Sequence, residues 1–180
     1  VVYAEQGVTK ADLVNYYVAV ADRMLAFVAN RPLSLVRCPQ GPTKHCFFQK
    51  HDTGGFPSGF RKVVIHGTEA DDNRYLYVDD LSGLISGVQM NVLEWHIWGA
   101  RRDDVEKAER IIFDIDPDEG LGFEHVKAAA RDIRDILGAL GLTAFPMVTG
   151  GKGIHVIAPI GRRTEWPETK AFCRAFSKML

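Results

Sequence analysis

Two aspartates separated by one residue end a strongly apolar segment, Ile111-Ile112-Phe113-Asp114-Ile115-Asp116-Pro117. Because strand side chains return to the same face at every second residue, we expect Asp114 and Asp116 to point the same way, with Cα atoms ~6.6 Å apart. Two carboxylates on one face repel each other, and a divalent cation removes that conflict. Oxygen ligands suit Mg²⁺ or Mn²⁺. The pattern indicates a two-metal site, and a turn with two hydrated carboxylates is the open alternative.

A glycine-rich segment, Thr149-Gly150-Gly151-Lys152-Gly153, follows a predicted strand and precedes His155. Its glycines allow backbone N–H groups to approach an anion, while Lys152 adds positive charge and Thr149 a hydroxyl donor. It is not a Walker A loop, because glycine follows Lys152 and the next element is a predicted strand. Together with the carboxylate pair and the two strand histidines, His96 and His155, the segment forms the parts of a triphosphate site. Taken singly, a hairpin with an exposed lysine and a sheet histidine explain these residues equally well.

The three cysteines, Cys38, Cys46 and Cys173, are too few for a disulfide framework. Cys38, His45, Cys46 and His51 lack the close cysteine spacing of zinc sites. A predicted strand over residues 45–49 also points His45 and Cys46 to opposite faces. Buried structural cysteines are therefore the favoured interpretation.

Helices and strands are predicted from apolar periodicity, caps and turn residues. Thr9 and Asp12 form a capping signal for a helix that ends before Arg31-Pro32. On the strand at 92–98, Glu94 and His96 share one face and Trp95 lies on the other. The composition of residues 52–59 indicates a flexible loop. Further strands are predicted at 33–37, 45–49, 61–66, 75–78, 111–116, 144–148 and 154–160, and further helices at 79–90, 123–140 and 167–180.

The chain has 180 residues, of which 46% are hydrophobic and 25% charged, so we expect one soluble domain over residues 1–180. Most strands do not alternate with helices. The expected fold is therefore α/β (α+β), with a mixed or antiparallel central sheet flanked by helices. No apolar run approaches the ~20 residues of a membrane span, so no membrane partner is expected. The first residues lack the pattern of a signal peptide, which favours a cytoplasmic protein.

Charge is unevenly distributed although the net charge is −1. Residues 63–120 carry 5 Lys and Arg against 14 Asp and Glu, whereas the flanking regions are basic. An acidic centre between basic ends fits a cation site beside polyanion-binding surfaces, and solvated faces are the plainer alternative.

Six segments, in order, resemble the polymerase domain of bacterial end-joining DNA ligases (ligase D), a branch of the archaeo-eukaryotic primase superfamily. The resemblance covers nearly the whole chain. The segments are Thr9–Asp12 with Tyr16-Tyr17, Arg31-Pro32 with Val36–Gly41, Phe47–His51, Leu93–Gly99, Phe113–Gly120, and Thr149–His155.

The resemblance implies a DNA repair polymerase that adds nucleotides, often ribonucleotides, to DNA 3′ ends at double-strand breaks by two-metal phosphoryl transfer. It matches Asp114 and Asp116 to the catalytic, metal-binding pair, with Mn²⁺ or Mg²⁺ as cofactor. The matched triphosphate-binding positions, for an NTP or dNTP, are His96, Thr149, Gly150, Gly151 and Lys152, with Lys50 beside them.

The resemblance also implies contacts with DNA. Lys10 matches a lysine that grips the 5′-phosphate of the downstream strand, assisted by Arg37. Phe56 and Phe60 lie in the predicted loop and are expected to stack on template bases, or alternatively to pack the loop against the sheet. A Ku-type partner, ligase and nuclease domains and a nucleoid location are implied in the same way.

Two departures from the family pattern shape the alternatives. Thr149 replaces a serine and keeps the hydroxyl. A third family aspartate, in a segment of the Asp-Tyr-x-x-Asn kind, has no match between Trp166 and Leu180, so we expect that the C-terminal portion of the domain is lacking. This keeps open a DNA-end-binding module without chemistry. The Asp-x-Asp strand alone also resembles aspartyl phosphatases, from which Pro117-Asp118 departs.

Overall fold

The computed structural model describes residue 3, residues 7–65 and residues 74–180. The chain divides into two compact units, Val1–Val105 and Glu106–Leu180, and each has its own buried core. The division falls in the charged connection between the predicted strands at 92–98 and 111–116. In the described ranges, no helix is long and apolar enough to cross a membrane.

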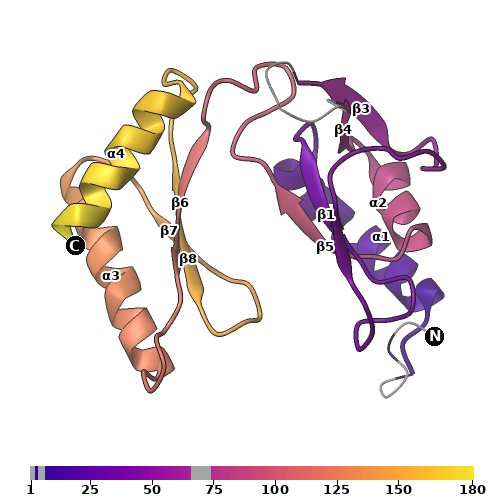
Figure 1. The fold of residues 1–180 in the computed structure, drawn as a ribbon, viewed down its shortest axis with the longest axis horizontal. Coiled ribbons are helices and arrows are strands. Elements are labelled where there is room, and N and C mark those ends of the chain that lie inside the picture. The colour runs from indigo at the N-terminus through magenta and orange to yellow at the C-terminus, as the bar shows by residue number, and fades with distance from the viewer. Residues whose placement is uncertain (1–2, 4–6, 66–73) are drawn as a thin grey trace. The chain divides into compact units, whose positions relative to one another are not determined.

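The first unit contains helices α1 (Lys10–Val28) and α2 (Leu81–Gln89) (Figure 1). The predicted capping of α1 is confirmed, since the Asp12 N–H donates to the Thr9 hydroxyl and the Thr9 N–H donates to the Asp12 carboxylate. The Thr9 hydroxyl also donates to the Asp12 carboxylate at 2.7 Å, and this bond, more than the one from the Thr9 N–H, lowers the pKa of Asp12. Asp80 caps α2 by accepting from the Gly83 N–H.

The strands of the first unit form two antiparallel sheets. One has the order β2 (Phe47–Gln49), β1 (Leu33–Arg37), β5 (Val92–Ile97), and the other pairs β3 (Arg61–Val64) with β4 (Arg74–Tyr77). Residues 66–73, which include the end of the strand predicted at 61–66, lie outside the described residues. β2 begins two residues later than predicted. Directly beyond its last pair with β1, Arg37 and Phe47, Cys46 joins Cys38 in a disulfide, and Cys46 is only partly buried, unlike the buried cysteine that the sequence favours.

The core of the first unit forms where α1 and α2 pack on the sheet. Trp95 is partly buried and packs against this core, with its indole N–H donating to the Tyr17 hydroxyl and its ring stacked on Phe60. Gly87 of α2 makes this packing possible, since a methyl group there would lie 2.3 Å from the Trp95 ring. The predicted alternation of β5 is thereby confirmed: Trp95 faces the core, whereas Glu94 and His96 are exposed.

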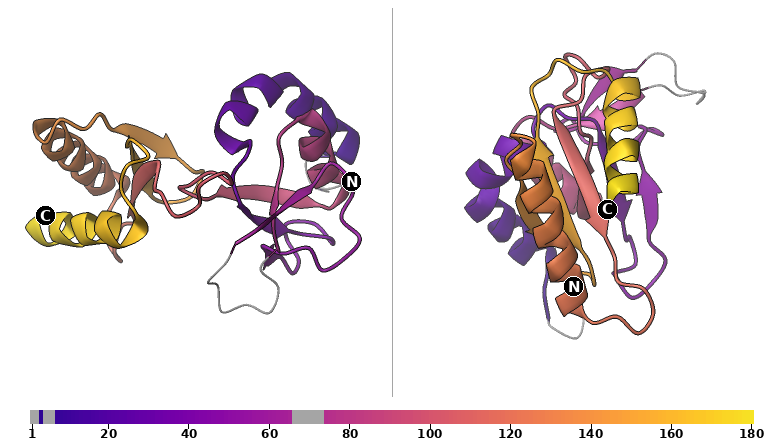
Figure 2. Two further views of the ribbon diagram at one scale, coloured as in Figure 1. Left: turned by 90° about the horizontal axis from the view of Figure 1, so that it is seen from above. Right: turned by 90° about the vertical axis from the view of Figure 1, so that its left-hand side faces the viewer.

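The second unit is one antiparallel sheet with the order β6 (Arg110–Ile115), β8 (Ile154–Pro159), β7 (Phe145–Val148). Helices α3 (Phe123–Ala139) and α4 (Trp166–Met179) both lie on one face of this sheet (Figure 2). Alternate strand residues such as Phe113 and Val156 pack under the helices. The residues between them, including Asp114 and Met147, face away from the helices and are exposed.

The predicted α/β fold with antiparallel pairing and flanking helices is confirmed. Its described strands are divided among three sheets. Predicted element boundaries agree with the structure to within about two residues where it is described, because caps and turn residues mark them. Gly141, for example, adopts a φ of 80° directly after α3, a left-handed conformation that glycine favours.

Candidate nucleotide and metal site

The open face of the second unit's sheet carries the carboxylate pair. Asp114 lies on β6 and Asp116 follows the strand directly, so alternation places both on the face without helices. Both side chains are exposed, Asp114 at 65%. Pro117 ends the strand because it has no N–H to donate. The pair is thus at the end of a strand, exposed to solvent.

His155 is the direct partner of Asp114. The two residues are opposite each other in the β6–β8 register, and His155 Nε2 lies 3.1 Å from Asp114 Oδ1. His155 Nδ1 is buried and has no hydrogen-bond partner among the described residues. The contact fixes one oxygen of Asp114 and leaves the other available.

Gly153 makes room for Asp116. A methyl group at Gly153 would lie 2.6 Å from Asp116 Oδ1 and 2.5 Å from the Ile115 carbonyl oxygen, both closer than van der Waals contact. Only a residue without a side chain therefore allows the Asp116 carboxylate to lie against this part of the hairpin.

The glycine-rich segment connects β7 to β8 at the same end of the sheet as Asp116, because Ile154 is opposite both Ile115 and Val148. Gly150 has a φ of 89°, in the left-handed region. Thr149 and Lys152 are exposed. The second unit thus brings Asp114, Asp116 and the loop with its lysine to one end of one sheet.

The donor atoms fit a hard divalent cation. Mg²⁺ is commonly held by one or two carboxylates together with substrate phosphates, and Mn²⁺ accepts the same oxygen ligands. Across residues 7–65 and 74–180, no group of three or more His, Cys, Asp and Glu is arranged to hold a metal ion. Asp114 and Asp116 would therefore hold a cation only in combination with substrate oxygens or further ligands.

In the first unit, His96 lies on the exposed face of β5. Its Nε2 is 2.7 Å from Glu94 Oε2, and its ring meets the edge of Phe48 with centroids 5.5 Å apart. Lys50 is exposed directly after β2. These residues form a polar and aromatic surface on one sheet of the first unit.

Lys10 and Arg37 meet at the carboxyl end of α2. Lys10 Nζ donates to the Gln89 carbonyl at 2.9 Å, and Arg37 Nε donates to the Met90 carbonyl at 2.8 Å. Such carbonyls lack intrahelical partners, so both cations stabilise the end of the helix. Burial lowers the pKa of the Arg37 guanidinium, which also lies over the rings of Phe47 and Phe56.

The two aromatic residues assigned to DNA differ in their surroundings. Phe60 is 5% exposed and packs against Trp95, which favours the packing alternative for this ring. Phe56 is partly exposed and meets Phe60 edge-on. Phe48, at 65% exposure, is more accessible than either of these rings, although the family resemblance implies no role for it. The sequence signal for an exposed ring is the pair Phe47-Phe48 on a short strand, because adjacent strand residues point to opposite faces and both rings cannot face the core.

The loop at 52–59 is held by specific bonds, in contrast to the predicted flexibility. The buried Asp52 carboxylate pairs with Lys62 and accepts from the Gly54 N–H at 2.9 Å. The hydrogen bond from Lys62 lowers the pKa of Asp52. Gln49 donates to the Thr53 hydroxyl at 3.0 Å. The loop that carries Phe56 is therefore tied to both β2 and β3.

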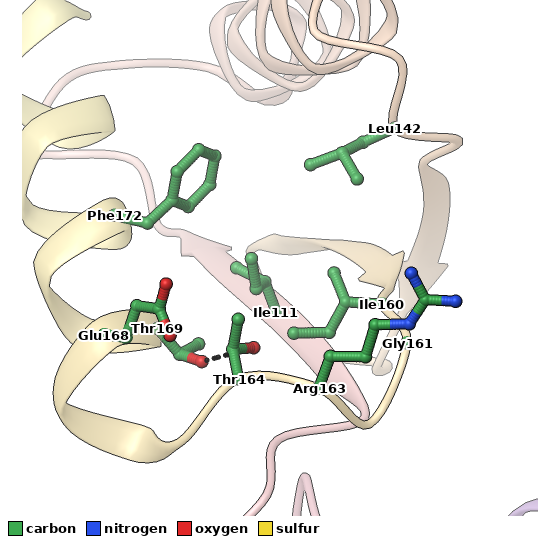
Figure 3. Close-up of a pocket in the computed structure, with 9 residues that line it drawn as sticks. All are labelled: Ile111, Leu142, Ile160, Gly161, Arg163, Thr164, Glu168, Thr169 and Phe172. Atoms are coloured by element: carbon green, nitrogen blue, oxygen red, sulfur yellow. Dashed lines mark hydrogen bonds between the residues drawn. The ribbon is translucent and has the colours of Figure 1, made fainter.

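The second unit also has a cavity of about 550 Å³ between the sheet and α4, lined partly by Ile111, Leu142 and Phe172 (Figure 3). It contains none of the predicted site residues. The catalytic assignment therefore rests on the open face of the sheet.

Comparison with known proteins identifies the family. The family described as LigD, primase-polymerase domain, matches residues 9–180, which cover nearly all of both units. The chain belongs to this family. The confirmed identification agrees with the resemblance carried by the six sequence segments.

Individual relatives are much longer proteins than this chain. The chain is 34% identical over 172 residues to the multifunctional non-homologous end joining protein LigD of Pseudomonas aeruginosa, covering 96% of this chain and 20% of the relative. It is 26% identical over 179 residues to the bifunctional LigD of Bacillus subtilis, covering 99% of this chain and 28% of that protein. The chain thus spans less than a third of either relative.

A solved structure supports the same relationship. The polymerase domain of Mycobacterium tuberculosis ligase D, determined in complex with DNA, matches with a TM-score of 0.90 and 28% identity. The match covers 99% of this chain and 65% of the solved one.

Proposed function

We propose that this chain forms the nucleotide-adding region of a DNA end-joining repair protein and acts on 3′ ends at double-strand breaks. The observation that carries the proposal is the exposed Asp114 and Asp116 pair beside a glycine-lysine loop, in a chain of the LigD primase-polymerase family. We propose that both units belong to one polymerase domain. Its expected partners are DNA ends with a 5′-phosphate, Ku and ligase or nuclease domains, at the nucleoid in the cytoplasm.

The residues of the second unit would bind metal and triphosphate. Asp114 and Asp116 would hold Mn²⁺ or Mg²⁺, and such cations activate a 3′-hydroxyl and stabilise a departing pyrophosphate when bound. Lys152, the Thr149 hydroxyl and the backbone of Gly150 and Gly151 would hold the phosphates of an NTP or dNTP. His155 would orient Asp114.

The residues of the first unit would contact the nucleic acid and assist with the nucleotide. We assign His96 and Lys50 to the triphosphate, and Lys10 with Arg37 to the 5′-phosphate. Lys10 has N–H groups beyond the one used at the Gln89 carbonyl, so it can also bind an anion. The exposed ring of Phe48 and the partly exposed ring of Phe56 suit stacking on bases.

The test is nucleotide addition to a gapped duplex with a 5′-phosphate, in Mn²⁺. Asp116→Asn should abolish extension and weaken Mn²⁺ binding measured by calorimetry, because one of two carboxylate ligands is lost. Asp118→Asn removes the same charge from an exposed aspartate two residues away and should leave both unchanged. Undiminished extension by the Asp116 variant would exclude this carboxylate from catalysis.

A second candidate function is DNA-end binding without nucleotide addition. It is favoured because, in the described residues, no group of three or more His, Cys, Asp and Glu is arranged to hold a metal ion. A DNA-end-binding module would bind 5′-phosphorylated recessed ends, lose that preference in Lys10→Ala, and add no nucleotide under any metal condition. Extension that depends on Asp116 would exclude it. Release of inorganic phosphate, rather than pyrophosphate, would instead favour a phosphatase.

A further inference from the structure

Helix α4 presents three cations in a row on its solvent face. Lys170, Arg174 and Lys178 are spaced four residues apart and are exposed. Each step advances about 6 Å along the helix axis, so the three charges extend over about 12 Å on one side of the helix. With Pro167, Ala171 and Ala175 they line a shallow depression of about 490 Å³.

These cations have no internal counter-charges. Within the described part of the chain, none of the three forms an ion pair or a side-chain hydrogen bond. The acidic residue of α4, Glu168, lines the separate cavity beside Phe172 (Figure 3). Like charges four residues apart repel and destabilise the free helix. The arrangement becomes favourable when an external anion is bound.

Helix α3 of the same unit differs from α4, because most of its cations are paired with acidic side chains. Two of its three Lys and Arg side chains pair with acids: Lys127 pairs with Glu124, and Arg134 Nη2 lies 2.7 Å from Asp135 Oδ1. The two helices cover the same face of the sheet, yet only α4 segregates positive charge. The basic face of α4 is therefore a property of that helix and not of the whole unit.

We propose that Lys170, Arg174 and Lys178 form a second nucleic-acid contact, which binds the phosphate backbone of duplex DNA away from the reacting end. A DNA strand carries one phosphate per 3.4 Å of helix axis, so the row spans roughly three to four phosphates. The small residues beside the cations allow a backbone to approach closely. A protein partner is disfavoured because the face lacks the aromatic anchors of protein interfaces.

The proposed duplex contact on α4 lies apart from the proposed metal and nucleotide site on the sheet. Phe176 packs on Phe113 beneath the helix, so the basic side of α4 points away from the sheet, and Asp114 and Asp116 lie on the sheet's opposite face. The inference of a duplex contact on α4 rests on the proposed function, because it assumes that the protein acts on DNA. It adds a surface for holding duplex that the nucleotidyl-transfer site does not touch.

The experiment compares two variants of the full chain that lose the same charge. One replaces Lys170, Arg174 and Lys178 by glutamine, and the other replaces Lys127, Arg131 and Arg134 of α3. Binding to a duplex capped by hairpins at both ends, which has no free end, is measured by fluorescence anisotropy from 50 to 200 mM salt. The slope of log K against log salt should fall in magnitude by about 2 to 3 for the α4 variant and by less than about 1 for the α3 control.

Equal slopes for the two variants would overturn the proposal, and so would binding of poly-glutamate in preference to DNA, which would indicate an acidic protein partner. Circular dichroism and thermal melting check that both variants fold. Preference for 5′-phosphorylated ends, measured in parallel, should be the same in the α4 variant as in the unaltered chain. Failure of the proposed function would abolish that end preference and leave the capped-duplex result unaffected.

Discussion

The two units hold their predicted site residues in different ways. In the first unit most of them make internal contacts: Lys10 and Arg37 donate to carbonyls of α2, His96 contacts Glu94, and Phe60 is part of the core. In the second unit Asp116, Thr149 and Lys152 are exposed. The difference teaches that substitutions of packed residues in the first unit, such as Phe60, should act mainly on stability, whereas those of exposed residues in the second unit should act mainly on binding.

The largest expected effect on the free energy of unfolding is at Phe60, and a second aromatic residue of the first unit, Phe48, serves as its comparison. Phe60→Ala should lower the free energy of unfolding by about 3–5 kcal/mol, because it leaves a cavity beside Trp95. Phe48→Ala should change it by less than about 0.5 kcal/mol, because that ring is exposed. Urea unfolding followed by tryptophan fluorescence measures both. Similar losses for the two variants would contradict the distinction between core and surface rings.

An intermediate effect is expected at Asp52. Asp52→Asn should cost about 1–3 kcal/mol, because it breaks the buried contact with Lys62. The pKa of Asp52 is lower when folded than when unfolded, so its contribution is fully present above the ordinary carboxyl pKa of about 3.9 and is lost as pH falls through the lowered value. Unfolding at pH 7 and at pH 3 should therefore differ less for the variant than for the unaltered chain.

The smallest effect is expected in the second unit. Asp116→Asn should shift the free energy of unfolding by less than about 0.5 kcal/mol, in either direction, because the carboxylate is exposed and its removal relieves repulsion with Asp114. Thermal melting without metal is the measurement. A loss of several kcal/mol would show that Asp116 has a structural role, and the contrast between the units would fail.

Local features were predictable because they depend on neighbouring residues. The capping box at Thr9 and Asp12, the inward Trp95 beside the exposed His96, and the common face of Asp114 and Asp116 all follow from spacings of three residues or fewer. These spacings correspond directly to the periods of the helix and the strand. The site residues of the second unit could therefore be found from the sequence.

Features that depend on distant residues were not predictable in the same way. The pairing of Asp114 with His155 needs the β6–β8 register, and the bond from Lys10 to Gln89 joins residues 79 apart. The burial of Phe60 depends on where Trp95 lies, and the Cys38–Cys46 disulfide depends on how β1 meets β2. No local period encodes such contacts, since tertiary packing decides them.

Gly153 has one further consequence, for the alignment of β6 with β8. β6 and β8 are paired up to Ile115 and Ile154, and directly beyond this pair the missing side chain of Gly153 accommodates the Asp116 carboxylate. Sliding β8 by one residue in either direction would bring Lys152 or Ile154 opposite Asp116 and would also turn every strand side chain to the wrong face. The absence of a side chain at Gly153 thus favours the native register of β6 and β8 over misaligned pairing during folding.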